Sequence, residues 1–209
     1  MDIMHIPAKS TIKARLSQRQ LALLPEKIGV VATIQFLDQV NAITKQLGGV
    51  RGGQVLGCDA SGAEKICGMV SAFLYIGSGT FHPINVYLKT KKPVYCFNPK
   101  TGELIKLERD TIAGFEKKKK AAIAKFLSAQ NIGILVSTKP GQNNLKEARS
   151  LKEALKEKKC YLFIFDTLDI AELENFPFIE CWVNTACPRI ADEKSNILNL
   201  EDIQAIKQR

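Results

Sequence analysis

The sequence predicts an α/β protein made of two related three-layer domains, each built on a parallel sheet from a duplicated strand–helix–strand unit. The prediction rests first on a repeat: an apolar run with an Ile-Gly pair at residues 28–31 precedes a helix-like segment, and the same order returns at 132–136, roughly half the chain later. It rests second on the further apolar runs that follow each copy. Near-continuous apolar strands that alternate with helices are typical of parallel sheets buried on both faces.

In the first half, the strand at 28–31 leads into a helix with Leu37, Val40 and Leu47 at near-helical spacing. We expect Gly48-Gly49 to end that helix. Further strands are expected at 54–57, 73–76 and 94–97, and the composition of residues 98–102 is that of a turn.

In the second half, a loop at 137–142 follows the repeated strand. A helix comes next, capped by Asn143 or Asn144, and its apolar residues are expected to face inward: Leu145, Ala148, Leu151 and Leu155. Strands are expected at 161–165 and 178–183. A helix at 116–130, with Ile123, Phe126 and Leu127 on one face, is expected to connect the halves.

We therefore expect an N-terminal arm at 1–24, a domain at 25–114 and a second domain at 115–209. Hydrophobic residues make up 45% of the chain and charged residues 24%, which is typical of a globular protein with a real core. The apolar runs are far shorter than the roughly 20 residues that cross a bilayer, and no secretory leader is recognisable, so we expect a cytoplasmic protein with no membrane partner.

The net charge of +9 favours a partner or substrate that carries negative charge. The four lysines at 117–120 are typical of a solvated helix face, and an interaction patch is the alternative. A basic nucleic-acid-binding module would bind with steep salt dependence. Because no binding motif supports that interpretation, we expect no direct nucleic-acid contact.

Two of the six cysteines follow expected strands, where loops of open α/β sheets hold ligands. Cys58 follows the strand at 54–57 and precedes residues 61–64, which resemble a capping box, so a helix N-terminus would favour its thiolate. Cys187 follows the strand at 178–183 and precedes Pro188. The alternative is that both are small buried hydrophobes. We expect the other four to lie in the core: Cys67, Cys96, Cys160 and Cys181.

Four ordered segments carry a resemblance to a known family: Gly53-Gln54-Val55-Leu56-Gly57-Cys58-Asp59, the loop at 77–83 that ends in Phe81-His82-Pro83, Ser137-Thr138-Lys139-Pro140-Gly141-Gln142, and Asn184-Thr185-Ala186-Cys187-Pro188-Arg189-Ile190. From about Leu24 to Glu193 the chain resembles the archaeal diphthamide synthases, the 2-(3-amino-3-carboxypropyl)histidine synthases.

The resemblance implies a noncanonical radical S-adenosylmethionine enzyme in which three similar α/β domains each give one cysteine to a 4Fe-4S cluster. S-adenosylmethionine takes the remaining iron, and its amino-carboxypropyl group is transferred to a histidine of translation elongation factor 2. Cys58 and Cys187 match two ligand positions, whereas the family's first domain has no counterpart here. The resemblance thus implies the C-terminal half of a split enzyme, a hetero-oligomer whose partner chain supplies the third cysteine, with a separate electron donor.

Other residues are candidates with open alternatives. Gly141 and Gln142 are candidates for S-adenosylmethionine contacts, or form a plain turn before a helix. Arg189 is a candidate for pairing with a carboxylate of the substrate, or makes an ordinary ion pair. His82 lines the site, or is packed within its loop. For the whole chain, the alternative function is a non-catalytic scaffold or electron-delivery subunit of the same complex.

Overall fold

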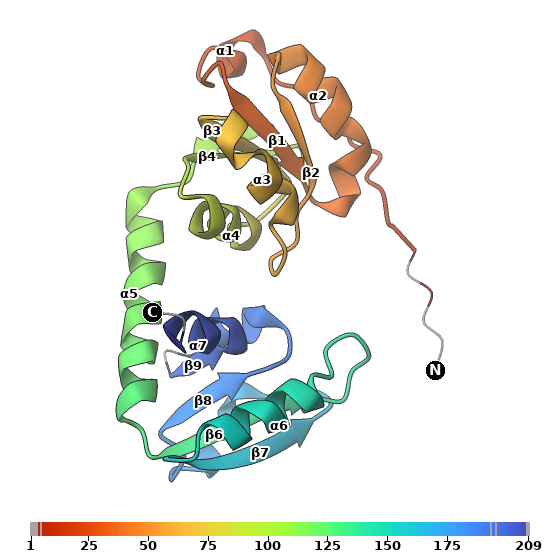
Figure 1. Cartoon of the computed structure of the whole chain (residues 1–209). Helices are drawn as coiled ribbons and strands as arrows, with labels where there is room; N and C mark the ends of the chain where they lie inside the picture. The colour runs from red at the N-terminus through yellow and green to blue at the C-terminus, as the bar shows by residue number, and fades with distance from the viewer. Residues whose placement is uncertain (1–3, 5, 193, 195, 208–209) are drawn as a thin grey trace. The chain divides into compact units, whose positions relative to one another are not determined.

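The computed structural model describes residues 4, 6–192, 194 and 196–207 (Figure 1). The chain divides into two compact units, Met1–Ile112 and Ala113–Arg209, which we call unit 1 and unit 2. The division falls inside helix α5 (Arg109–Ser128). None of the helices in the described part is both long and apolar enough to cross a membrane.

Unit 1 holds a five-stranded sheet in the order β2-β1-β3-β4-β5, whose first four strands are parallel and whose last is antiparallel. The strands are β1 (Ile28–Ala32), β2 (Val50–Gln54), β3 (Ala72–Ile76), β4 (Val94–Asn98) and β5 (Glu103–Lys106). The helical segments are α1 (Gln18–Leu21), η1 (Ile34–Gln39), α2 (Val40–Leu47), α3 (Ser61–Ile66), η2 (Cys67–Met69) and α4 (Phe81–Thr90), where η denotes a 3-10 helix.

Unit 2 holds a four-stranded parallel sheet in the order β7-β6-β8-β9. The strands are β6 (Asn131–Ser137), β7 (Lys159–Phe165), β8 (Cys181–Asn184) and β9 (Ile197–Asn199). The helical segments that accompany them are most of α5, then α6 (Leu145–Ala154), η3 (Ile170–Asn175), η4 (Pro188–Asp192) and α7 (Leu200–Lys207). The α/β class with parallel sheets is therefore confirmed.

The two sheets repeat one topology, since the first four strands of each unit are arranged in the order second, first, third, fourth. The Ile-Gly pairs occupy equivalent sites in β1 and β6. Gly29 lies in register with Phe73, and Gly133 lies in register with Trp182. A Cβ on either glycine would come within 3 Å of the facing ring. Both glycines therefore leave room for an aromatic side chain of the next strand, which explains the repeat in the sequence.

Each sheet is covered by apolar side chains on both faces. In unit 1, α2, η1 and the arm cover one face, and Ile66 of α3 packs beside Phe73 on the other. In unit 2, α5, α6 and α7 share one core cluster, whereas η3 and an aromatic group cover the second face. That aromatic group comprises Phe163, Phe176 and Trp182, whose ring centroids lie 4.7 to 6.3 Å apart.

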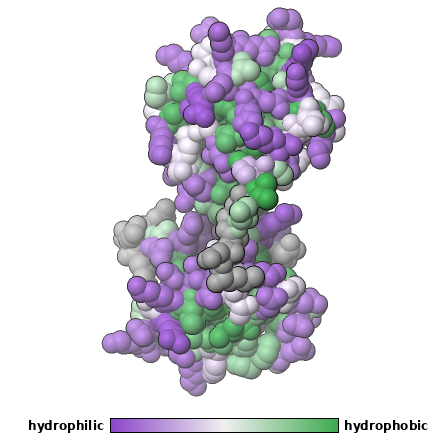
Figure 2. Space-filling view, turned by 90° about the vertical axis from the view of Figure 1, so that its right-hand side faces the viewer, coloured by the Kyte–Doolittle hydropathy of each residue, from purple (hydrophilic) through white to green (hydrophobic). Residues whose placement is uncertain are grey.

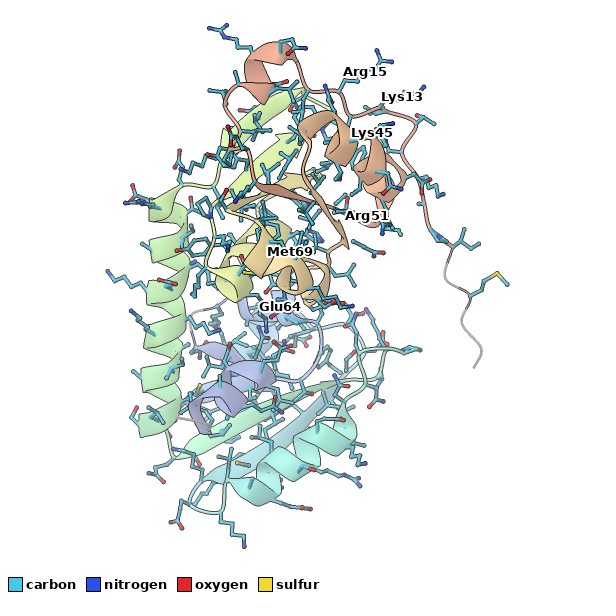
Figure 3. All side chains as sticks on the ribbon, turned by 45° about the horizontal axis from the view of Figure 1, so that its top comes forward. Lys13, Arg15, Lys45, Arg51, Glu64 and Met69 are labelled. Carbon is cyan, nitrogen blue, oxygen red and sulfur yellow. The ribbon has the colours of Figure 1, made fainter. Side chains whose placement is uncertain are left out.

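The segment before β1 belongs to the core of unit 1. Ala14 and Leu16 are buried, while Lys13 and Arg15 between them are exposed (Figure 3). The side chain of Gln39 binds the backbone of this segment at both Ile12 and Ala14. The expected arm therefore packs against η1 and α2 rather than preceding a separate compact unit.

Several expected boundaries are wrong. The strand expected at 54–57 is β2, which ends at Gln54, and the strand expected at 178–183 begins only at Cys181. The sequence around both is apolar, but residues 55–57 and 178–180 lie in irregular backbone. Helix α5 begins at Arg109, and its Leu127 is 58% exposed rather than inward.

Local turn and helix signals fare better. Gly48 ends α2 in the left-handed conformation with φ of 58°, and Gly102 closes the turn between β4 and β5. In α6, Ala148 and Leu151 are buried as expected. Asn144 occupies the N-cap position, whereas the side chain of Asn143 accepts the hydrogen bond from the Leu145 N–H.

Candidate metal centre

Both candidate ligands lie in loops that follow parallel strands. Cys58 is four residues beyond the end of β2, and Cys187 is three residues beyond the end of β8. The carboxyl ends of parallel strands meet at one edge of a sheet, and the loops beyond that edge are where such folds bind ligands. Each unit thus presents one cysteine at its ligand-binding edge.

The Cys58 loop is a tight turn held by its own backbone. The Leu56 N–H donates to the Asp59 carbonyl at 2.8 Å, which leaves Gly57 and Cys58 at the tip. A Cβ at Gly57 would lie 1.6 Å from Cε1 of Phe81, so only glycine leaves room for this ring. Cys58 is exposed, which rules out the alternative that it is a buried hydrophobe.

Asp59 connects this turn to α3. Its carboxylate accepts a hydrogen bond from the Ser61 N–H at 2.8 Å, and the bonds to Ser61, followed by the charge of Lys65, hold the pKa of this carboxyl below its usual range. The capping box expected from Ser61 is wrong, because the N-cap residue is Ala60 and no side chain caps there. The carboxylate needed at the start of the helix comes from Asp59 instead.

The Cys187 loop is held by a buried side chain. Asn184, which is 1% exposed, donates from Nδ2 to the Cys187 carbonyl at 2.9 Å and accepts the Ala186 N–H at 3.0 Å. The next residue, Thr185, bonds to the Leu135 carbonyl of β6 through both its N–H and its hydroxyl. Cys187 itself is half-buried, so its thiol is neither sealed in the core nor fully solvated.

A second asparagine extends this network. Asn184 Nδ2 also donates to Asn199 Oδ1 at 2.7 Å, and Asn199 Nδ2 donates to the Pro188 carbonyl at 3.1 Å. The backbone N–H of Asn199 donates to Asp202, which forms an ion pair with Lys119. The backbone on both sides of the bond from Cys187 to Pro188 is therefore tied to β9 and α7.

Three of the other four cysteines are unsuitable as ligands. Cys96, Cys160 and Cys181 are buried in strands, as expected. Burial raises the pKa of Cys96 and Cys181 to about 12 and also raises that of Cys160, so all three remain thiols at neutral pH. Cys67 is half-buried, and its sulfur lies 3.6 Å from the Thr90 carbonyl.

The structure brings the loop of Gly141 and Gln142 next to the Cys187 loop. Asn144, two residues beyond Gln142, donates from Nδ2 to the Thr185 carbonyl at 2.6 Å. Gly141 is exposed with φ of 77°, and the Gln142 N–H donates to the Lys139 carbonyl, so this loop is a turn. Arg189 is exposed in η4, directly after Pro188.

His82 lies beside the Cys58 loop through its neighbour Phe81. The two residues belong to the first turn of α4, so the expected loop at 77–83 ends at Thr80. The His82 ring stacks on Tyr75 with centroids 5.9 Å apart and is half-buried. The structure therefore confirms a packed histidine near the turn that carries Cys58.

Sequence reasoning missed the residues that hold these loops, above all Asn184, Asn199 and Phe81. Asn184 stands inside the motif that ends in Ile190, but its buried partner Asn199 is 15 residues away with no local signal. Within the described residues, no group of three or more His, Cys, Asp or Glu side chains is placed to hold a metal ion. Neither unit assembles a complete metal site from its own described side chains.

The fold and these loops define a class of protein: duplicated parallel α/β units, each with one accessible cysteine at the ligand-binding edge of its sheet. Comparisons with known proteins specify this class. A family of diphthamide synthesis proteins matches residues 1–196. The chain belongs to this family.

Individual relatives agree. The chain is 38% identical over 140 residues to a 2-(3-amino-3-carboxypropyl)histidine synthase of Pyrococcus horikoshii, a match covering 66% of this chain and 39% of the relative. It is 31% identical over 180 residues to subunit 1 of such a synthase from Encephalitozoon cuniculi, covering 79% and 50%. The chain thus spans half or less of the length of these relatives.

A solved structure, Dph2 from Pyrococcus horikoshii with a 4Fe-4S cluster, matches with a TM-score of 0.78 and 30% sequence identity. The match covers 91% of this chain and 60% of that chain. The likeness supports the α/β fold of both units.

Proposed function

We propose that this chain is part of a 2-(3-amino-3-carboxypropyl)histidine synthase, with Cys58 and Cys187 as two of the thiolate ligands of a 4Fe-4S cluster. One observation carries the proposal: Cys58 and Cys187 are the two cysteines in loops beyond the carboxyl ends of parallel strands, whereas three of the others are buried thiols. A relative with this fold holds such a cluster. The reaction is transfer of the amino-carboxypropyl group of S-adenosylmethionine to a histidine of elongation factor 2.

The donor set fits an iron–sulfur cluster, because such clusters are held by cysteine thiolates. When bound by three thiolates, the cluster supplies an electron to the S-adenosylmethionine at its fourth iron. An external one-electron donor provides that electron. The bond from sulfur to the amino-carboxypropyl carbon breaks, methylthioadenosine leaves, and the new carbon–carbon bond on the imidazole forms with loss of one proton and one electron from the ring.

The chain's own residues position ligands and substrate in this proposal. The turn closed by Leu56 and Asp59 presents Cys58, and Asn184 fixes the backbone that carries Cys187. The exposed turn at Gly141 and Gln142 offers backbone and amide groups to S-adenosylmethionine beside the Cys187 loop. The Arg189 guanidinium suits the carboxylate of the same substrate.

Two thiolates are one fewer than the cluster needs, so the third ligand comes from another polypeptide in this proposal. The three strand cysteines of this chain do not replace it, because their burial keeps them protonated. Subunit naming among the relatives supports a multi-chain enzyme. The complex also needs an electron donor and elongation factor 2 as protein substrate.

The test combines the full chain with the N-terminal part of the Pyrococcus horikoshii synthase that it does not match. After anaerobic reconstitution with iron and sulfide, bound iron and labelled transfer from S-adenosylmethionine to elongation factor 2 are measured with dithionite as reductant. Cys58→Ala and Cys187→Ala should each lower bound iron at least about tenfold, since each removes a ligand. Cys67→Ala is the matched control and should leave it unchanged.

Full iron content and full transfer in both loop variants would overturn the assignment. Normal iron binding by the wild-type complex without any transfer, even with its own elongation factor 2, would instead favour a scaffold or electron-delivery subunit.

A further inference from the structure

Strand β7 presents the longest regular sheet edge in the described part of the chain. All seven of its residues pair in unbroken register with β6, and no described strand pairs with its outer side. The segment contains neither glycine nor proline, and its one charged residue is Lys159 at the start. Such an edge is a template for pairing with a further strand.

The other sheet edges are protected. β2 is shorter, its register shifts between Val30 and Val31, and it carries the exposed Arg51 near Lys45 of α2 (Figure 3). β5 has four residues with charges at both ends, and β9 has three. Bulges, charges and short length are the usual devices that prevent edge pairing, and β7 has none of them.

Apolar side chains surround the β7 edge. Ile164 is 64% exposed and Tyr161 38%, and Phe178 beside Tyr161 is 48% exposed with its ring centroid 5.3 Å away. Hydrophobic residues reach the surface at the lower end of the space-filling view, the end where Figure 1 places β6, β7 and α6 (Figure 2). Exposed apolar groups of this size commonly mark an interaction surface.

The charges that flank β7 indicate its occupant. The amino end carries Lys156, Lys158 and Lys159, and the carboxyl end is followed by Asp166 and Asp169. A second copy of this chain, paired antiparallel, would place the cationic end of each strand against the anionic end of the other. Parallel pairing would place like charges together, so the edge is self-complementary in one orientation only.

We propose that β7 is a homodimer interface, in which two copies of unit 2 join their sheets through antiparallel β7 strands. A two-fold axis perpendicular to the sheet requires opposed residues to share a face, and centring it on Leu162 meets this condition. Tyr161 then lies opposite Phe163 of the second copy, Cys160 opposite Ile164, and Lys158 opposite Asp166. The pairing covers Ile164 and satisfies the outer backbone groups of the strand.

The test measures self-association of the full chain by sedimentation equilibrium up to about 100 µM, a concentration at which an interface with a micromolar Kd is occupied. Ile164→Lys should raise the dimer dissociation constant at least about tenfold, because it places a charge within the paired edge. Leu127→Lys, at an equally exposed leucine of α5, is the matched control and should leave association unchanged. Circular dichroism verifies that both variants are folded.

A charge swap tests the orientation. Lys158→Glu and Asp166→Lys should each weaken the dimer several-fold, and the double variant should restore it. Because Lys158 also donates to the Leu127 and Ala129 carbonyls, its fold and stability are verified in each variant. A chain that stays monomeric at all concentrations, or a dimer unaffected by Ile164→Lys, would overturn the proposal, as would association with a foreign chain alone.

Discussion

The loops of Cys58 and Cys187 follow sheets of the same topology but are held in different ways. Cys58 follows β2, an edge strand, and its turn depends on backbone bonds and on the Phe81 ring packed where Gly57 has no side chain. Cys187 follows β8, an internal strand, and its loop depends on the buried amide of Asn184. The repeat therefore preserves the sheet while the cysteine is carried by a different loop in each unit.

The difference teaches that the two cysteines respond to different kinds of substitution. A steric change disturbs the Cys58 turn, because space is what defines it. Loss of hydrogen bonding disturbs the Cys187 loop, because buried polar groups without partners are costly. The expected effects can be ordered by how deeply each supporting group is buried.

The largest effect is expected for Asn184→Leu. This change leaves the Ala186 N–H and the Cys187 carbonyl without their side-chain partner and should lower the free energy of unfolding by about 3 kcal/mol. It should also speed alkylation of Cys187 relative to Cys58, measured by peptide mass spectrometry. Asn175→Leu, at an exposed position of η3, is the control. Unchanged stability and alkylation would show that the amide network does not hold this loop.

A smaller effect is expected for Gly57→Ala. The new Cβ would overlap Cε1 of Phe81, so the ring or the turn must move, at a cost of about 2 kcal/mol. Urea unfolding measures the change. Gly68→Ala is the matched control, since a Cβ there meets nothing within 4 Å. If both variants unfold at the same urea concentration, Phe81 does not define the Cys58 turn.

The smallest effect is expected for Asp59→Asn. The pKa of Asp59 is lowered from its ordinary 3.8, so its carboxylate stabilises the folded state above that pH and loses this contribution as pH falls. Because the group is largely solvated, the variant should lose only about 0.5 kcal/mol at pH 7. The difference from wild type in thermal unfolding should vanish in acid, and a difference that grows in acid would contradict this account.

The sequence was informative wherever a signal was local. The Ile-Gly pairs identified the central strands, because glycine is needed where an aromatic residue of the next strand packs. Gly48 and residues 98–102 marked a helix end and a turn for the same local reason. The motifs around Cys58 and Cys187 identified both loops and the family to which the chain belongs.

Local signals failed where distant residues compete for the same backbone. Residues 54–57 look like a strand, yet the backbone turns because the Leu56 N–H bonds to Asp59 and Phe81 packs on Gly57. Ser61 looks like a cap, yet Asp59 performs that role. Strands β5 and β9 are short and charged or polar, so their pairing with β4 and β8 gave no period to detect.

The amino-acid order by itself determined the α/β repeat, the family and the two cysteines worth testing, because each depends on residues close together in the chain. The tertiary structure decided which cysteines remain buried thiols, which amide holds Cys187 and which sheet edge is left open. Burial and hydrogen bonding at those places join residues such as Asn144 and Thr185, 41 positions apart, and such contacts exist only once the sheets have formed.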